Sequence, residues 1–272
     1  MYCVYTISMD PINFVLFAFG IAIGSFLNVL IDRLPVGLDV IKGRSHCDHC
    51  NRTLSWFELI PIFSWILQGG RSRCCHKKLS VQYPLIECIV GLGFVSIYQQ
   101  FGGGEVTVPF IAALLLFCAS VGIFVVDLKT ECIPEVFLYA GAIGAIALIS
   151  PLFVPCLLGV SSVCSSIFSL YILPTGVGMA FFFLLWFFSK GKAMGDGDIY
   201  LSGIIGLALG FPKLIVAFYA AFLTGAVAGV ILILVRKKRM KSHIPFGPFM
   251  ILGLGVAFLY GPAILHWWSQ LW

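Results

Sequence analysis

The chain has 272 residues, of which 60% are hydrophobic and only 11% are charged, and its net charge is +5. This much apolar sequence excludes a soluble globular protein, and so modest a charge gives no indication of a nucleic-acid partner. The composition predicts an all-α polytopic membrane protein surrounded by lipid.

Eight apolar runs are predicted to cross the membrane as helices. Each is near the length that a bilayer requires, or a little below it. The second and the sixth are short and contain glycine. The runs are 11–31, 84–100, 108–126, 134–150, 168–189, 198–211, 213–235 and 244–265.

Lysines and arginines are concentrated in alternate loops. The first loop holds Arg33, Lys42, Arg44, Arg52, Arg71, Arg73, Lys77 and Lys78. The third, fifth and seventh loops hold Lys129, Lys190, Lys192 and the cluster 236–241. Only Lys213 falls on the other side. By the positive-inside rule the odd-numbered loops are cytoplasmic, and both termini are outside.

The first span, within residues 1–31, is followed by the long polar segment 32–83 and then by the bundle 84–272. Gly24 and Ser25 in the first span suit close helix contact, and Asn28 needs a hydrogen-bond partner if it is buried. On the outside, Cys156 and Cys164 lie in a predicted loop, where an oxidising compartment would allow a disulfide.

The polar segment contains candidate metal ligands. Cys47 and Cys50 form a CxxC pair, and Cys75 follows at the distance expected of a zinc ribbon. Ser72 occupies the position where Cys75 would have its CxxC partner, so Cys74 or His76 would have to be the fourth ligand. Zn²⁺ binding by Cys47, Cys50 and Cys75 is one interpretation, and a degenerate knuckle held by packing is the other.

Asp127 and Asp198 are acidic residues at the ends of apolar runs, where a carboxylate is costly unless it has a function. Two predicted spans separate them, so both emerge at the same cytoplasmic boundary. They could form a catalytic pair, or each could be a helix cap. Gly195 and Gly197 flank Asp196 and would let another backbone approach. Spacing alone does not decide between Asp196 and Asp198. Glu87 is a third costly acid, predicted to pair with a base or to face the bundle interior.

Together these segments resemble the type IV prepilin peptidases, which are bifunctional leader peptidases and N-methyltransferases of the GxGD aspartic protease group. The resemblance covers nearly the whole chain, and its motifs occur in the family's order. They are GSFLNVLIDRLP at 24–35, CxxC at 47–50, a segment with Trp56, Pro61 and Trp65, YPLIE at 83–87, DLKTECIPE at 127–135, GDGD at 195–198 and IPFGPF at 244–249.

The resemblance implies that Asp127 and Asp198 are the catalytic acids, whereas Asp196 is at the variable position of the motif. It implies a bacterial inner-membrane enzyme that cleaves prepilins or pseudopilins at the cytoplasmic face. It also implies N-methylation of the new N-terminus from S-adenosylmethionine. The family associates the segment 32–83 with methylation and places four cysteines there. Three of them correspond here to Cys47, Cys50 and Cys75, and Ser72 stands at the position of the fourth.

Other interpretations remain open. Because Ser72 replaces a cysteine, the chain could be a peptidase without methyltransferase activity. In a different class, it could be a carrier in which Asp127, Asp198 and Glu87 relay protons or hold a cation. The sequence does not indicate which pilin is processed, which of the two acids is the base, where the cofactor binds or what the oligomeric state is.

Overall fold

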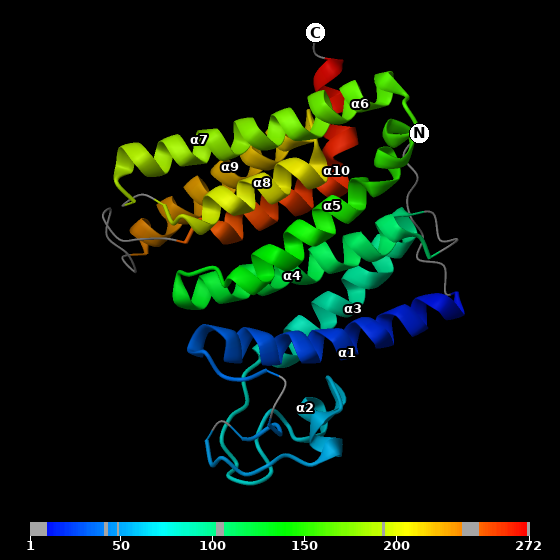
Figure 1. The fold of residues 1–272 in the computed structure, drawn as a ribbon. Coiled ribbons are helices and arrows are strands. Elements are labelled where there is room, and N and C mark those ends of the chain that lie inside the picture. Colours follow the sequence, from blue (N-terminus) through cyan, green and yellow to red (C-terminus); the bar gives the residue numbers. More distant parts are fainter. Residues whose placement is uncertain are drawn as a thin grey trace. The chain divides into compact units, whose positions relative to one another are not determined.

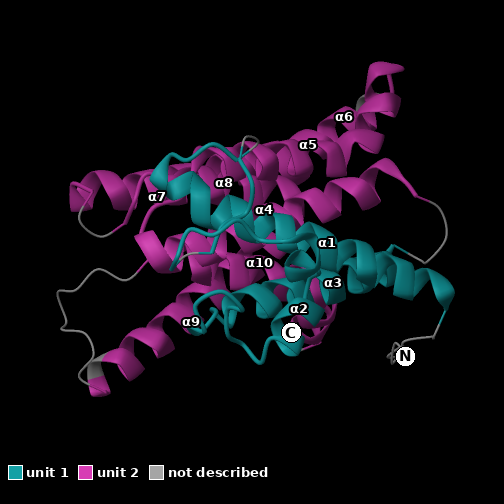
Figure 2. Ribbon diagram, turned by 90° about the horizontal axis from the view of Figure 1, so that it is seen from below, with its two compact units in different colours: residues 1–105 teal, residues 106–272 magenta. Residues whose placement is uncertain are grey.

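The computed structural model describes residues 10–40, 43–47, 49–101, 106–191, 194–235 and 245–270. In these ranges the regular structure is helical apart from two isolated β-bridges, which confirms the all-α prediction. Lys42, Lys192, the basic cluster 236–241 and Ile244 lie outside the described residues. The chain divides into two compact units, residues 1–105 and 106–272, which Figure 2 colours separately.

The first unit is built on two apolar helices, α1 (Pro11–Arg33) and α3 (Gln82–Gln100). A Cβ atom added to Gly24 would lie only 2.9 Å from Glu87 Cα, so the absence of a side chain lets the two helices pack closely. Buried Asn28 has the partners it needs, because it donates to the Tyr83 carbonyl (3.2 Å) and accepts from Gln82 (3.3 Å).

Between α1 and α3 the chain forms short elements rather than long helices (Figure 1). These are η1 (Leu34–Val36), η2 (Trp56–Leu59) and α2 (Phe63–Leu67). One bridge joins His46 to Thr53 and the other joins Arg71 to Lys78. The cysteines of the polar segment lie within the two hairpin-like turns that these bridges close.

The second unit is a bundle in which most helices are long and apolar. Its elements are α4 (Val108–Thr130), α5 (Glu135–Leu157), α6 (Ser161–Ile167), η3 (Phe168–Ile172), α7 (Leu173–Ser189), α8 (Gly197–Leu209), α9 (Lys213–Leu234) and α10 (Gly247–Ser269). The predicted outer loop 151–167 is largely helical, because α5 continues through Pro151 and Pro155 and α6 begins at Ser161. Cys156 and Cys164 form a disulfide there, with a Cα–Cα distance of 5.0 Å.

The predicted spans correspond to helices of this structure. In the described residues, six helical segments are long and apolar enough to cross a membrane, and one of them runs from Ser162 through η3 to Ser189. The other two predicted spans correspond to α3, with 19 residues, and α8, with only 13. These are the two runs that looked weakest in the sequence.

Candidate functional site

Asp127 lies in the last turn of α4, and only 4% of its surface is exposed. The backbone N–H of Gly247, at the start of α10, donates a hydrogen bond to the Asp127 carboxylate. A Cβ atom added to Gly247 would lie 2.5 Å from Asp127 Oδ2, which is too close for any side chain. Glycine at this position therefore allows the end of α4 to approach the beginning of α10.

Asp198 lies in the first turn of α8 and is equally buried, with 5% exposure. The backbone N–H of Gly195 donates to its carboxylate. Asp196 has a different position, because it is exposed and its side chain caps α8 by accepting from the Gly197 N–H at 3.0 Å. Of the two acids that spacing could not separate, Asp198 is the one that lies inside the bundle.

Ile133 connects the surroundings of the two acids. After α4, Glu131 adopts a left-handed conformation with φ of 55°, which ends the helix and turns the chain back. Ile133 then contacts both glycine positions: an added Cβ would lie 3.2 Å from it at Gly197 and 3.4 Å from it at Gly247. Figure 1 shows the end of α4 and the beginnings of α8 and α10 at the same end of this unit.

The Asp127 and Asp198 carboxylates are close enough to interact electrostatically. Two buried carboxylates in each other's field do not both ionise easily, so such a pair tends to share one proton. One member can then act as a base while the other donates a proton, which is the requirement for general acid–base chemistry. Gly195 leaves space beside this pair, since an added Cβ would meet only Gly197 N at 4.0 Å.

In the first unit, four thiols form a cluster. The Sγ atoms of Cys47, Cys50, Cys74 and Cys75 all lie within 4.8 Å of one another. The Cys47–Cys75 sulfur distance is 3.8 Å and the Cys50–Cys74 distance is 3.0 Å. Tetrahedral zinc with bonds of about 2.3 Å requires sulfur separations of about 3.8 Å. The Cys47–Cys75 pair has this separation and the Cys50–Cys74 pair is closer, while four thiols are the right ligand type for Zn²⁺.

The two cysteine turns are an internal repeat with an offset of 25 residues. The hydrogen bond from Cys47 N to Arg52 O (2.9 Å) corresponds to the one from Ser72 N to Lys77 O (2.9 Å). The bond from Asn51 N to Cys47 O (2.9 Å) corresponds to the one from His76 N to Ser72 O (2.8 Å). Asn51 and His76 also share a φ of 55°. Ser72 therefore has the place that Cys47 has in the first turn. Cys74, and not His76, supplies the fourth thiol of the cluster.

Ser72 still contributes to the cluster through its hydroxyl group, which lies 3.3 Å from Cys47 Sγ and 2.9 Å from Cys74 Sγ. The hydrogen bond with Ser72 lowers the pKa of the Cys47 thiol to about 6, and the neighbouring Cys74 raises the pKa of Cys50 to about 12. Metal ligation requires thiolates, so the Ser72 hydroxyl favours the ligating form of Cys47.

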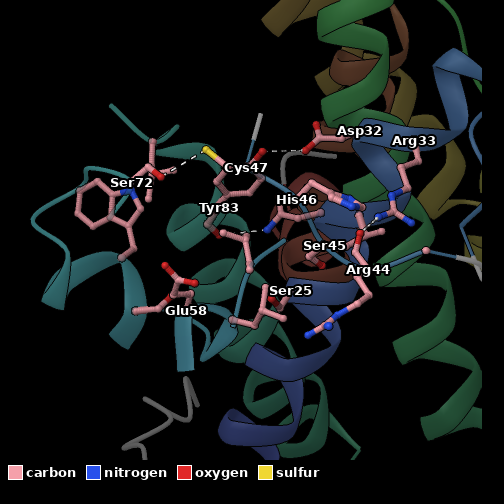
Figure 3. Close-up of a pocket in the computed structure, with 18 of the residues that line it drawn as sticks. Ser25, Asp32, Arg33, Arg44, Ser45, His46, Cys47, Glu58, Ser72 and Tyr83 are labelled. Carbon is pink, nitrogen blue, oxygen red and sulfur yellow. Dashed lines mark hydrogen bonds between the residues drawn. The ribbon is translucent and has the colours of Figure 1, made fainter. Parts of the chain in front are cut away.

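A cavity of about 830 Å³ lies beside the cluster, within the first unit. Figure 3 shows side chains from α1 (Ser25, Asp32, Arg33), from the following loop (Arg44 to Cys47) and from Glu58 and Tyr83 around it. Glu87 also lines the cavity, and its exposure is 5%. Its carboxylate accepts a hydrogen bond from the Ile62 N–H at 2.7 Å. Glu87, on α3, thereby holds the loop that precedes α2.

Several residues of these sites were not identified from the sequence. Gly247 and Ile133 are examples, although the position of Gly247 between two prolines marks it as a constrained helix start. The stretch 56–67 contains Trp56, Pro61 and Trp65 of the motif set and includes η2 and α2. It supplies Trp65 and Ser64 to the cavity wall.

Comparison with known proteins gives results over nearly the whole chain. Residues 18–101 match the Bacterial Peptidase A24 N-terminal domain, and residues 111–230 match the Type IV leader peptidase family. A prepilin leader peptidase/N-methyltransferase of Bacillus subtilis is 30% identical, and the alignment covers 94% of this chain and 98% of that protein. The corresponding protein of Aeromonas hydrophila is 30% identical, with 93% and 92% covered.

A prepilin leader peptidase/N-methyltransferase of Myxococcus xanthus is 33% identical over 80% of this chain, which covers 62% of that protein. No solved structure matches. Identity of this level over almost the full length of the Bacillus and Aeromonas proteins goes well beyond a shared motif. The chain belongs to the type IV prepilin leader peptidase family.

Proposed function

We propose that this protein removes the short basic leader from prepilins or pseudopilins, using Asp127 and Asp198 as an acid–base pair. The observation that carries the proposal is the burial of both carboxylates, on separate helices, within each other's electrostatic field. The names of the relatives supply the substrate class, and Gly195 leaves space for a peptide backbone beside the pair.

In the proposed reaction the ionised carboxylate takes a proton from water, which attacks the scissile carbonyl. The protonated carboxylate polarises that carbonyl and later gives its proton to the departing amine. The N–H groups of Gly247 and Gly195 each hold one carboxylate in place, so neither acid needs to reorganise during the reaction.

We place the enzyme in the bacterial inner membrane, with the acid pair at the cytoplasmic face and both termini outside. The distribution of lysine and arginine supports this orientation. The disulfide supports it too, since Cys156 and Cys164 lie in the segment assigned to the oxidising side. The free thiols Cys47, Cys50, Cys74 and Cys75 are on the side assigned to the reducing cytoplasm.

For the second activity, we propose methylation of the new N-terminal amine from S-adenosylmethionine. The name N-methyltransferase of the relatives supports it. When bound, this cofactor supplies a methyl group on a positively charged sulfur. The amine gains an N–CH₃ bond, the S–CH₃ bond breaks, and one proton leaves the amine. Zn²⁺ on Cys47, Cys50, Cys74 and Cys75 would have a structural role, because four thiolates leave no open coordination position.

Coexpression with a candidate prepilin tests both activities. The expected product is a pilin shortened by its leader, whose N-terminal mass carries one additional methyl group. A shortened but unmethylated pilin would remove the second activity and favour a peptidase that has lost methylation. An uncleaved prepilin, together with proton- or cation-dependent flux in liposomes, would instead support a carrier.

A further inference from the structure

We propose that the cavity in the first unit is the binding site for S-adenosylmethionine, with Glu87, Arg33 and Trp65 as its principal contacts. This rests on the proposed methyl transfer and goes beyond it by naming the site. The cofactor carries a positive sulfur, a carboxylate and a hydrogen-bonding base. It therefore needs a cavity that offers an acidic side chain, a basic side chain and a hydrogen-bond donor together.

The dimensions of the cavity fit a cofactor. Its volume of about 830 Å³ is within the usual range for small-molecule sites. Another pocket, in the other unit, is lined by apolar side chains such as Leu173, Phe181 and Phe218. That pocket has no charged group in its wall and cannot bind a zwitterion. The first cavity is lined by both acids and arginines, including Asp32, Arg33, Arg44 and Glu87.

Glu87 provides the negative charge. Its side chain is 5% exposed, and its carboxylate accepts hydrogen bonds from Ile62 N–H and from the Ser25 hydroxyl. Among the described residues the structure pairs it with no lysine or arginine, since the ion pair found there joins Arg52 to Glu58. Burial without a cation disfavours the ionised form of a carboxylate, and a positively charged ligand would favour that form.

Arg33 provides the positive charge at another part of the wall. Backbone carbonyls hold its guanidinium group, which donates to Asp39 O at 3.1 Å and to Arg44 O at 3.4 Å. Figure 3 shows Arg33 and Arg44 on the same side of the cavity. Neutral carbonyls orient the group without cancelling its charge, so it can pair with the carboxylate of a ligand.

Trp65 shows that one polar atom of the wall has no partner. Its Nε1 atom is buried and makes no hydrogen bond within the described part of the chain. Buried N–H groups are nearly always satisfied, and an acceptor on a bound ligand would satisfy this one, since Trp65 lines the cavity. The ring nitrogens of an adenine base and the ribose oxygens are such acceptors.

Direct binding to the zinc-loaded full-length protein in lipid nanodiscs tests the assignment. The ligands are S-adenosylmethionine, sinefungin, whose amine imitates the positive sulfur, and S-adenosylhomocysteine, whose sulfur is neutral. Glu87→Gln should weaken the first two by about tenfold or more, as removal of a buried charge partner does, and the third distinctly less. Trp65→Phe and Arg33→Gln should weaken all three ligands.

Each variant has a matched control outside the cavity. Trp56→Phe changes an exposed tryptophan of the same unit, Arg73→Gln changes an arginine that lies over Phe57, and Glu135→Gln changes an exposed acid of the other unit. These should bind all three ligands as the unmodified protein does. Thermal unfolding and zinc content show which variants are folded. If Glu87→Gln is not folded, the binding of the three ligands to Trp65→Phe and Arg33→Gln decides whether the cavity is the site.

The outcomes separate this proposal from the proposed function. If the unmodified protein binds the cofactor and methylates pilin, and the folded cavity variants bind it equally well, the site is elsewhere and methyl transfer stands. If the protein cleaves prepilin but neither binds the cofactor nor methylates, both the methyl transfer and the site are wrong. Glu87-dependent binding of a basic leader peptide without cofactor binding would reassign the cavity to the substrate.

Discussion

Asp127 and Asp198 are carried by long helices, whereas the four clustered cysteines are carried by turns between isolated bridges. Around the acids, backbone N–H groups hold both carboxylates, and Gly247 permits an approach that no other residue would allow. Around the cysteines, two residues have positive φ and a large cavity lies open beside them. The first arrangement suits chemistry on fixed groups, and the second suits binding of a metal and a ligand.

Apart from loss of the acids themselves, the largest effect is expected where α4 and α10 approach each other. Gly247→Ala would place a Cβ 2.5 Å from Asp127 Oδ2, so the carboxylate must move. Misplacement of a catalytic group by about 1 Å costs about 100-fold in rate, and we expect prepilin cleavage to fall by that factor. Gly255→Ala on the same helix is the control, because nothing lies within 4 Å of its added Cβ.

Cleavage by Gly247→Ala at the rate of Gly255→Ala would mean that the position of Asp127 does not matter. The close packing of α4 against α10 around Asp127 would then have no role in cleavage. A rate assay on purified protein, with thermal unfolding measured in parallel, separates displacement of the acid from loss of the fold.

The thiol cluster predicts a second effect, on metal content. Cys74→Ser should remove most of the bound zinc, because serine is a poor zinc ligand. His76→Ala and Cys88→Ser should retain it, since neither side chain belongs to the cluster. Elemental analysis of the purified variants is the measurement. Zinc loss in His76→Ala, but not in Cys74→Ser, would show that His76, and not Cys74, is the fourth zinc ligand.

A smaller effect is expected from the serine that stands in the place of a cysteine. Ser72→Ala removes the hydroxyl that hydrogen-bonds to Cys47 and Cys74, and loss of such a contact typically weakens metal binding by about 10-fold. Competition with a chromogenic chelator measures the affinity. An affinity equal to that of the unmodified protein would reduce Ser72 to a packing residue.

The smallest effect on activity is expected at the disulfide. Cys156→Ser should lower stability by about 2 kcal/mol, the value for a short closed loop, and leave cleavage within about twofold. In intact cells a membrane-impermeant maleimide should label Cys156→Ser more than the unmodified protein, because Cys164 is freed on the outside. Additional labelling that appears only after lysis would reverse the proposed orientation.

The sequence predicted the membrane fold well because long apolar runs have few alternatives in lipid. It also predicted that Asp127 would share a boundary with one acid of the GDGD motif, because an even number of spans separates them. It could not show that Asp196 is an exposed cap and Asp198 buried, since this depends on where α8 begins.

The polar segment was harder to predict. Periodicity does not describe turns, and the spacing alone does not show that Cys74 rather than His76 joins the other three thiols. The cavity and the unpaired Trp65 N–H arise from the packing of α1, α2 and α3 around the loop. Helices that satisfy their own backbone can be read from sequence more easily than sites that depend on distant partners.

The most direct test of the account compares two acids that are only two residues apart. Purified Asp196→Asn and Asp198→Asn, with Asp127→Asn alongside, are incubated with prepilin in nanodiscs, and the cleaved product is quantified by mass spectrometry. We expect Asp196→Asn to cleave at nearly the normal rate and the other two to lose about 1,000-fold or more, as loss of an essential acid–base group does. Normal cleavage by Asp127→Asn or Asp198→Asn would contradict the account.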